Sequence, residues 1–108
     1  MVYDEKYREV YSSDPAATPG RIESIYDELR GDYEFVKPQL AAEEDLRLVH
    51  GENHINSVKR RRGVYEVAAL AVGGAIRASE LAMRGEPAFG LIRPPWHHAS
   101  RDSSWGFC

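Results

Sequence analysis

The chain of 108 residues is long enough for one domain with a single modest core, and its 43% apolar and 29% charged residues are typical of a globular protein rather than a disordered or fibrous one. A formal net charge of −3 gives no electrostatic case for nucleic acid or an anionic membrane as the main partner. The single cysteine, Cys108, excludes an internal disulfide and a cysteine-rich zinc site, but it is compatible with an intermolecular disulfide. We expect a cytoplasmic protein.

The first part of the chain alternates extended and helical patterns. Residues 1–3 form a possible short strand, and residues 12–20 are rich in Ser, Pro and Gly, which predicts a loop. Residues 33–37 alternate as a strand does before Pro38 ends it. Between the loop and this strand a helix is predicted to open at Thr18-Pro19 and to end at Gly31, because four apolar residues share one face: Ile22, Ile25, Tyr26 and Leu29.

The second part is predicted to be mainly helical. Residues 41–50 and 52–62 read as short helices separated by Gly51, and residues 64–84 read as the longest helix. Gly73-Gly74 inside that helix costs roughly 1 kcal/mol per glycine relative to alanine, which predicts close packing against another backbone. Residues 87–92 form a continuous apolar run typical of a buried parallel strand.

Strands that alternate with helices predict a parallel sheet covered by helices, because crossover connections are right-handed. We therefore predict an α/β fold with three α/β/α layers and a short parallel sheet of about three strands, in one domain over residues 1–108. No membrane segment is expected, because the longest apolar run, residues 67–76, is far shorter than the roughly 20 residues of a membrane-spanning helix. The N-terminus is polar almost at once, unlike a signal peptide.

The loop at residues 93–108 carries the most informative chemistry of the chain. It follows the best predicted strand, at the sheet end where α/β proteins place their sites. Pro94-Pro95 stiffens the backbone just before two adjacent histidines, His97 and His98. Adjacent side chains in extended backbone diverge, so proton transfer suits this pair better than a shared metal ion. Taken alone, two histidines in a loop are also compatible with a solvated surface.

The longer string around these histidines resembles a known family. Residues 93–99 read R-P-P-W-H-H-A and residues 106–108 read G-F-C, which is similar to the R-P-P-G-H-H-A and G-F-C signature of the histone deacetylase and acetylpolyamine amidohydrolase superfamily. The resemblance spans essentially the whole chain, with upstream elements in the same order: Arg21, Val36-Lys-Pro38, Glu44-Asp-Leu46, Val49-His50, Tyr65-Glu66, Gly73-Gly74 and Pro87-Ala-Phe89.

The resemblance implies a truncated piece of the arginase/deacetylase-like fold and specific roles for five residues. Members of this superfamily are zinc-dependent enzymes that hydrolyse acetyl-lysine or acetylpolyamine amides. By resemblance, His97 and His98 are the general base and general acid, while Gly106 and Phe107 line the acyl-lysine channel. Arg21 matches, in a looser motif, an arginine beside the acetate-release passage.

Two departures from the family pattern affect activity. The family's zinc ligands, an Asp-x-His pair and a later Asp, lie downstream of the Gly-Phe-Cys motif, and no substitute ligand set is visible in these 108 residues. Trp96 replaces a glycine of the family, and we expect an indole at that position to crowd the histidines. The sequence therefore predicts the N-terminal third of a deacetylase, without metal ligands and inactive by itself.

The alternative function is a metal-free, self-associating interaction module or a truncation product with no catalytic role. A bare apolar edge at residues 87–92, or an adjacent helix face, would favour homo-oligomers.

Two other clusters of polar residues are weaker candidates for a functional site. His50 and His54 have an i, i+4 spacing that can bind metal, but Gly51 interrupts the helix between them. Residues 59–62, K-R-R-R, could contact nucleic acid or an acidic partner, but they also suit a predicted helix C-terminus, where the helix dipole favours cations.

Overall fold

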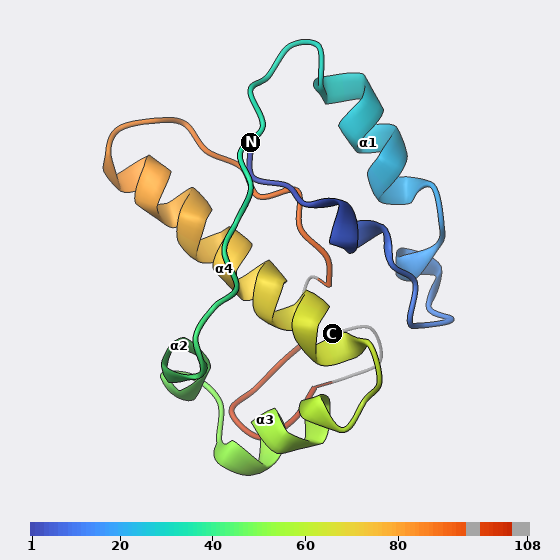
Figure 1. The fold of residues 1–108 in the computed structure, drawn as a ribbon, viewed down its shortest axis with the longest axis vertical. Helices are drawn as coiled ribbons and strands as arrows, with labels where there is room; N and C mark the ends of the chain where they lie inside the picture. Colours follow the sequence, from blue (N-terminus) through green and yellow to red (C-terminus); the bar gives the residue numbers. More distant parts are fainter. Residues whose placement is uncertain (95–97, 105–108) are drawn as a thin grey trace.

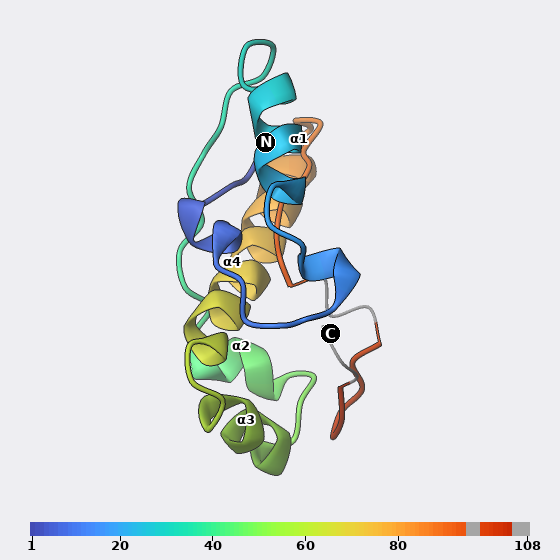
Figure 2. The same ribbon diagram turned by 90° about the vertical axis from the view of Figure 1, so that its right-hand side faces the viewer.

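The computed structural model describes residues 1–94 and 98–104. The molecule is flattened, with extents of 41 × 33 × 19 Å, and Figures 1 and 2 show its broad face and its narrow side. Three of the predicted helices are confirmed as α1, α3 and α4, and the predicted helix over residues 41–50 is reduced to the short α2. The described elements are the 3-10 helices η1 (Glu5–Arg8) and η2 (Pro15–Ala17), then α1 (Arg21–Leu29), α2 (Glu43–Arg47), α3 (Glu52–Lys59) and α4 (Val64–Met83).

The prediction of an α/β fold with a parallel sheet of three strands is wrong for the described residues. They contain no β-strand, and the three segments expected as strands make only two isolated parallel bridges, from Val2 to Val36 and from Val2 to Gly90. The central segment is too short for a ladder, because Asp4 caps η1 directly after Tyr3. A strand that turns into a helix after three residues can pair with its neighbours at one position only.

The three extended segments nevertheless lie side by side, with Val2 in the middle. The Val2 amide donates to the Phe89 carbonyl at 2.8 Å, and the Leu91 amide donates back to the Val2 carbonyl at 2.9 Å. On the other side, the Val36 amide donates to the Met1 carbonyl at 2.9 Å. Val2 itself is fully buried. This arrangement joins the N-terminal residues to residues 89–91, and Leu91, Arg93 and Pro94 are buried.

Helix α4 is the central element of the molecule, and it runs diagonally across the broad face in Figure 1. Its middle is buried, since Val67, Leu70 and Ala71 belong to the main apolar cluster. Tyr7 of η1 packs in the same cluster and donates its hydroxyl hydrogen to the Leu70 carbonyl at 2.7 Å. The other buried members of the cluster are Tyr3, Ile22 and Leu91, so it joins α4 to η1, α1 and the segment that precedes Pro94.

The two glycines inside α4 allow close packing, as the sequence predicts. A Cβ atom on Gly73 would overlap the backbone carbonyl of Gln39, and the Ala41 amide donates to the Ala69 carbonyl beside it at 3.1 Å. A Cβ atom on Gly74 would come within 2.7 Å of the Ile92 side chain. The first glycine therefore brings a backbone segment onto α4, whereas the second makes room for a side chain of the segment that leads to the histidines.

Among the described residues, no helix is long and apolar enough to cross a membrane.

Candidate functional site

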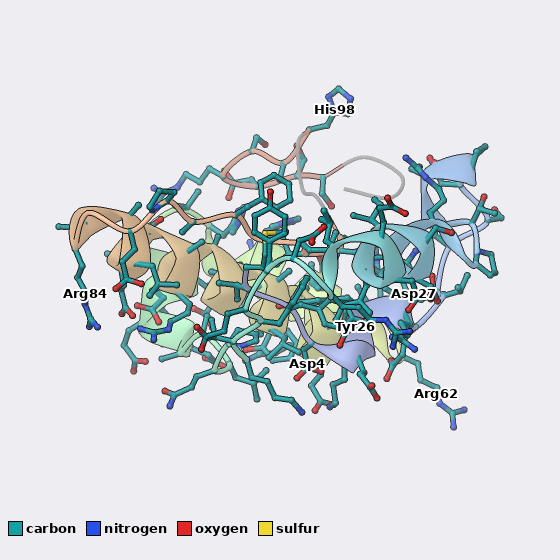
Figure 3. The ribbon with its side chains drawn as sticks, turned by 90° about the horizontal axis from the view of Figure 1, so that it is seen from above. Asp4, Tyr26, Asp27, Arg62, Arg84 and His98 are labelled. Carbon is teal, nitrogen blue, oxygen red and sulfur yellow. The ribbon has the colours of Figure 1, made fainter. Side chains whose placement is uncertain are left out.

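The structure describes only part of the predicted site. His97, Gly106 and Phe107 lie outside the described residues, whereas His98 and Arg21 lie within them. His98 is exposed, and Figure 3 shows its side chain extending away from the body of the molecule. Arg21 is the first residue of α1 and is also exposed. The described part of the site consists of the residues just before and just after the tandem histidines, together with the side chains that contact them.

Arg93 is a buried residue at the start of the predicted loop at residues 93–108, which we call the histidine segment because it contains His97 and His98. Its side chain and backbone together are only 5% exposed, and its guanidinium donates to the Glu9 carbonyl at 3.2 Å and to the Ala17 carbonyl at 3.4 Å. A buried cation needs such acceptors, because an unpaired charge in the interior is costly. Arg93 therefore joins residues 91–94 to both ends of the loop that contains η2.

Arg93 and Arg21 line the same cavity, which has a volume of about 200 Å³. Arg21 and Arg93 are the charged residues of this lining, and the other lining residues are apolar. Its lining residues are Ala16, Arg21, Ile22, Ile25, Leu91, Ile92 and Arg93. Cationic donors set in apolar walls suit a small anion such as a carboxylate. Arg21 therefore lies at the same cavity as Arg93, which precedes the tandem histidines by four residues, and its role at an acetate-release passage stays a prediction.

The positioning contribution of Arg93 was missed in the sequence analysis, which treated it only as part of a motif. One signal could have found it. Arg93 directly follows the apolar run at residues 87–92, and a single cation at the end of a buried segment requires hydrogen-bond acceptors nearby. Which carbonyls supply those acceptors depends on the tertiary fold, so the sequence alone could not name Glu9 and Ala17.

His50 and His54 do come together, but not as a metal centre. Their ring centroids lie 5.0 Å apart, and both line an apolar cavity of about 100 Å³ between α3 and α4. Burial of His54 lowers its pKa below the usual value of 6.5, and the neighbouring His50 lowers it further. Within residues 1–94 and 98–104, no group of three His, Cys, Asp or Glu side chains could hold a metal ion. The described residues therefore do not fit the zinc that the resemblance implies.

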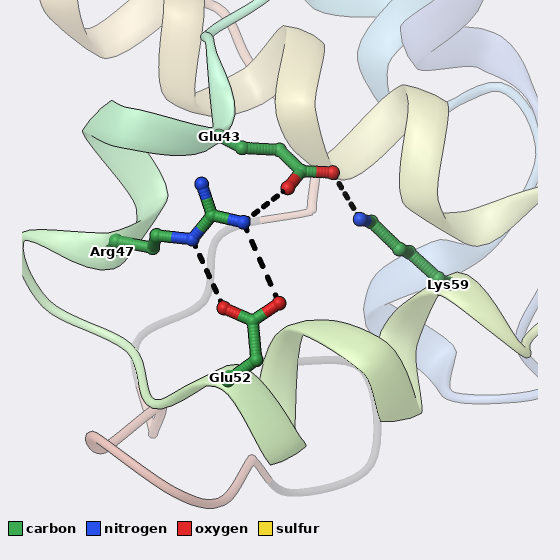
Figure 4. Close-up of polar contacts among 4 residues, drawn as sticks. All are labelled: Glu43, Arg47, Glu52 and Lys59. Carbon is green, nitrogen blue, oxygen red and sulfur yellow. Dashed lines mark hydrogen bonds and ion pairs between the residues drawn. The ribbon is translucent and has the colours of Figure 1, made fainter.

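The basic run at residues 59–62 is partly accounted for by a surface ion-pair network (Figure 4). Lys59 pairs with Glu43, whose other carboxylate oxygen contacts Arg47 at 2.7 Å. Arg47 also pairs with Glu52 at 3.0 Å. This network joins α2 to both ends of α3, and it lowers the pKa of the Glu43 carboxyl, chiefly through the hydrogen bond from Lys59. A structural role for Lys59 is therefore the better interpretation.

The comparisons with known proteins identify the family of this fold and this motif. The Histone deacetylase domain matches residues 15–108, which is most of the chain. The chain belongs to the histone deacetylase domain family. Its fold is similar to that in the crystal structure of the HDA15 HD domain, with a TM-score of 0.79 and 21% identity over 99% of this chain and 39% of that chain.

The curated relatives are several times longer than this chain. A probable deacetylase of Methanothermobacter thermautotrophicus is 35% identical over 89 residues, which cover 68% of this chain and 27% of the relative. Histone deacetylase 5 of Arabidopsis thaliana is 30% identical over an alignment that covers all of this chain and 21% of the relative. Polyamine deacetylase HDAC10 of Danio rerio is 27% identical, with the same two coverages. The chain thus spans about a fifth to a quarter of these relatives' length.

Proposed function

We propose that this chain supplies the tandem-histidine segment of a zinc-dependent deacetylase that hydrolyses acetyl-lysine or acetylpolyamine amides. The observation that carries the proposal is the match of the Histone deacetylase domain over residues 15–108, which includes the R-P-P-W-H-H-A and G-F-C strings. The relatives support the reaction class, since they include probable deacetylases and a polyamine deacetylase. The choice between lysine and polyamine substrates is left to the assay.

In this proposal the histidines move protons. An imidazole titrates near neutral pH, so one member of the pair can be neutral while the other is charged. A neutral His97 would accept a proton from the attacking water, and a charged His98 would donate one to the leaving amine. Gly106 and Phe107 would form a wall of the substrate channel, and Arg21 would act at the cavity it shares with Arg93.

The metal ligands are proposed to come from a part of the family domain outside residues 1–108. The described residues hold no group of three side chains able to bind a metal ion. We therefore expect the 108-residue chain to be inactive by itself. Trp96 stands where the family signature has glycine, and we expect a Trp96→Gly variant to be at least as active as the parent in any completed enzyme.

The proposal is tested by completing the domain. Residues 1–108 would be joined to the part of the Methanothermobacter thermautotrophicus relative that follows its aligned region, and hydrolysis of acetyl-lysine peptides and acetylpolyamines would be measured. His97→Ala or His98→Ala is expected to lower turnover by roughly 100-fold or more, the usual contribution of general acid–base catalysis. Asn53→Ala, an exposed change on α3, serves as the control. Turnover that neither histidine variant reduces would contradict the proposed roles.

A second proposed function, self-association without catalysis, rests on the edge at Phe89. Its carbonyl bonds to Val2, but its side chain is 59% exposed beside the three paired segments. A large exposed apolar side chain is suited to packing against a second copy of the chain. Sedimentation equilibrium is expected to show a mass that increases with concentration and that Phe89→Lys returns to the monomer value. A monomer mass at every concentration would count against this function.

A further inference from the structure

The segment that follows the tandem histidines is attached to the junction between α2 and α3. The His50 Nδ1 atom lies 2.8 Å from the Ser100 carbonyl oxygen, and the Gly51 amide donates to the Arg101 carbonyl at 2.9 Å. The neighbouring residues His50 and Gly51 therefore bond to the neighbouring carbonyls of Ser100 and Arg101. His98, the second proposed catalytic histidine, is only two residues before Ser100.

The attached segment has an internal structure of its own. The Ser100 amide donates to the Ser103 carbonyl at 2.8 Å, and the two serine hydroxyls lie 2.8 Å apart. Residues 100–103 thus form a closed turn, and a contact at its first residue is transmitted to the whole turn. The turn is therefore fixed both by its own hydrogen bonds and by those from His50 and Gly51.

Gly51 makes this close approach possible. A Cβ atom at position 51 would overlap the Asp102 carboxylate, and it would lie 3.9 Å from the Arg101 carbonyl oxygen. The Gly51 carbonyl, in turn, accepts from the His54 and Ile55 amides at 3.1 Å each, at the start of α3. Gly51, the residue at the N-terminus of α3, thus also bonds to the turn.

The contact between His50 Nδ1 and the Ser100 carbonyl oxygen shows which ring nitrogen of His50 must carry a hydrogen. A carbonyl oxygen can only accept a hydrogen bond, so Nδ1 must carry the hydrogen. In a neutral imidazole this leaves Nε2 without one, and the partner of one nitrogen thereby fixes the tautomer of the ring. A charged imidazole carries hydrogens on both nitrogens and could make the same bond.

We infer that His50 is a positioning residue, which through its Nδ1–H bond to the Ser100 carbonyl holds the turn at residues 100–103 against the α2–α3 junction and so fixes the backbone that follows His98. The inference rests on the proposed function only for the role of His98. The attachment of the turn is a property of the chain by itself, so it is measured without any catalytic assay. Failure of the attachment and failure of the proposed chemistry are therefore separate results.

Amide hydrogen exchange of the 108-residue chain tests the attachment. In His50→Leu, the Gly51 amide is expected to exchange about three- to tenfold faster, the range for loss of one hydrogen bond, while the Leu70 amide inside α4 keeps its rate. His50→Asn places an amide N–H near the position of Nδ1 and is expected to restore the Gly51 rate to within about twofold. Asn53→Ala, an exposed change on the same helix, should alter neither rate.

Two results would overturn the inference. One is a Gly51 rate that His50→Leu leaves unchanged, or that rises only in step with the Leu70 rate, because a general loss of stability would accelerate both amides. The other comes from ¹⁵N spectra of the parent chain above neutral pH, which do not depend on the variants folding. The inference predicts hydrogen on Nδ1 of His50, and a spectrum with hydrogen on Nε2 alone would contradict it.

Discussion

Arg93 connects three parts of the chain through one side chain. Its guanidinium bonds to the carbonyls of Glu9 and Ala17, and its backbone lies two residues after Leu91 of the main apolar cluster. Arginine suits this place because a planar guanidinium presents several donors in a fixed arrangement. Lysine has a single ammonium group and would reach the two carbonyls less well.

Replacing Arg93 is expected to destabilise the fold. Arg93→Met keeps most of the aliphatic volume but leaves the two carbonyls without their donors, which should lower the free energy of unfolding by about 1–3 kcal/mol. Arg84→Met, on an exposed arginine just after α4, is the matched control and should change it by less than about 0.5 kcal/mol. Urea unfolding measures both, and equal effects of the two changes would refute the proposed importance of the buried bonds.

His54 makes stability depend on pH. Burial and the neighbouring His50 lower its folded-state pKa, so the unfolded chain binds a proton at a higher pH than the folded chain does. The free energy of unfolding is therefore unaffected by this group well above pH 6.5 and falls as the pH drops from 6.5 towards the folded-state pKa. The fall is limited to about 1.4 kcal/mol per pH unit for one proton.

The comparison of the parent chain with His54→Leu isolates this effect. Urea unfolding at about pH 7.5 and about pH 5.5 should show a larger loss of stability for the parent than for the variant, because only the parent can bind the extra proton on unfolding. Other groups titrate in both chains and cancel in the difference. An identical pH dependence in the two chains would show that His54 is not the group responsible.

At the scale of elements, α4 was the most predictable part of the molecule. The length of α4 and its buried stripe follow from the local periodicity of its apolar residues. Its glycine pair predicted close packing against another segment. The partner itself could not be predicted. The backbone at Gln39 reaches Gly73 only because residues 36–41 leave the bridge at Val36 and run along the helix, which is a tertiary relation.

A single methyl group on α4 tests this packing. Glycine to alanine inside a helix normally stabilises by about 1 kcal/mol, but Gly73→Ala would force its Cβ into the Gln39 carbonyl. We expect a net loss of roughly 1–3 kcal/mol, the usual cost of overpacking. Ser79→Ala, an exposed change on the same helix, is the control and should be nearly neutral. Thermal unfolding of Gly73→Ala at or above the parent temperature would show that the approach is not tight.

The extended segments were the least predictable elements. Residues 33–37 and 87–92 have the composition of strands, yet each makes one bridge to Val2 and no ladder. Strand formation requires a partner of matching length, and the partner here ends at Asp4, where its side chain caps η1. Local pattern reports how a segment prefers to be arranged, but not how many residues of its neighbour are available to pair.

At the scale of the whole molecule, the described residues around the tandem histidines come from distant parts of the chain. Arg21 and Arg93 share a cavity at the root of the histidine segment, and His50 and Gly51 hold the turn after it. The sequence motif predicted the family, because its residue order is specific. It could not predict the supports of the site, since those come from residues more than 40 positions away in the sequence.

We propose that His97 and His98 transfer protons in a completed deacetylase domain, and residues 1–94 and 98–104 hold no group of three side chains that could bind the metal of such an enzyme. The most direct test is zinc content and amide hydrolysis of the purified 108-residue chain, with acetyl-lysine peptides and acetylpolyamines as substrates. We expect less than stoichiometric zinc and no turnover above that of buffer. Stoichiometric zinc together with turnover that His97→Ala abolishes would contradict it.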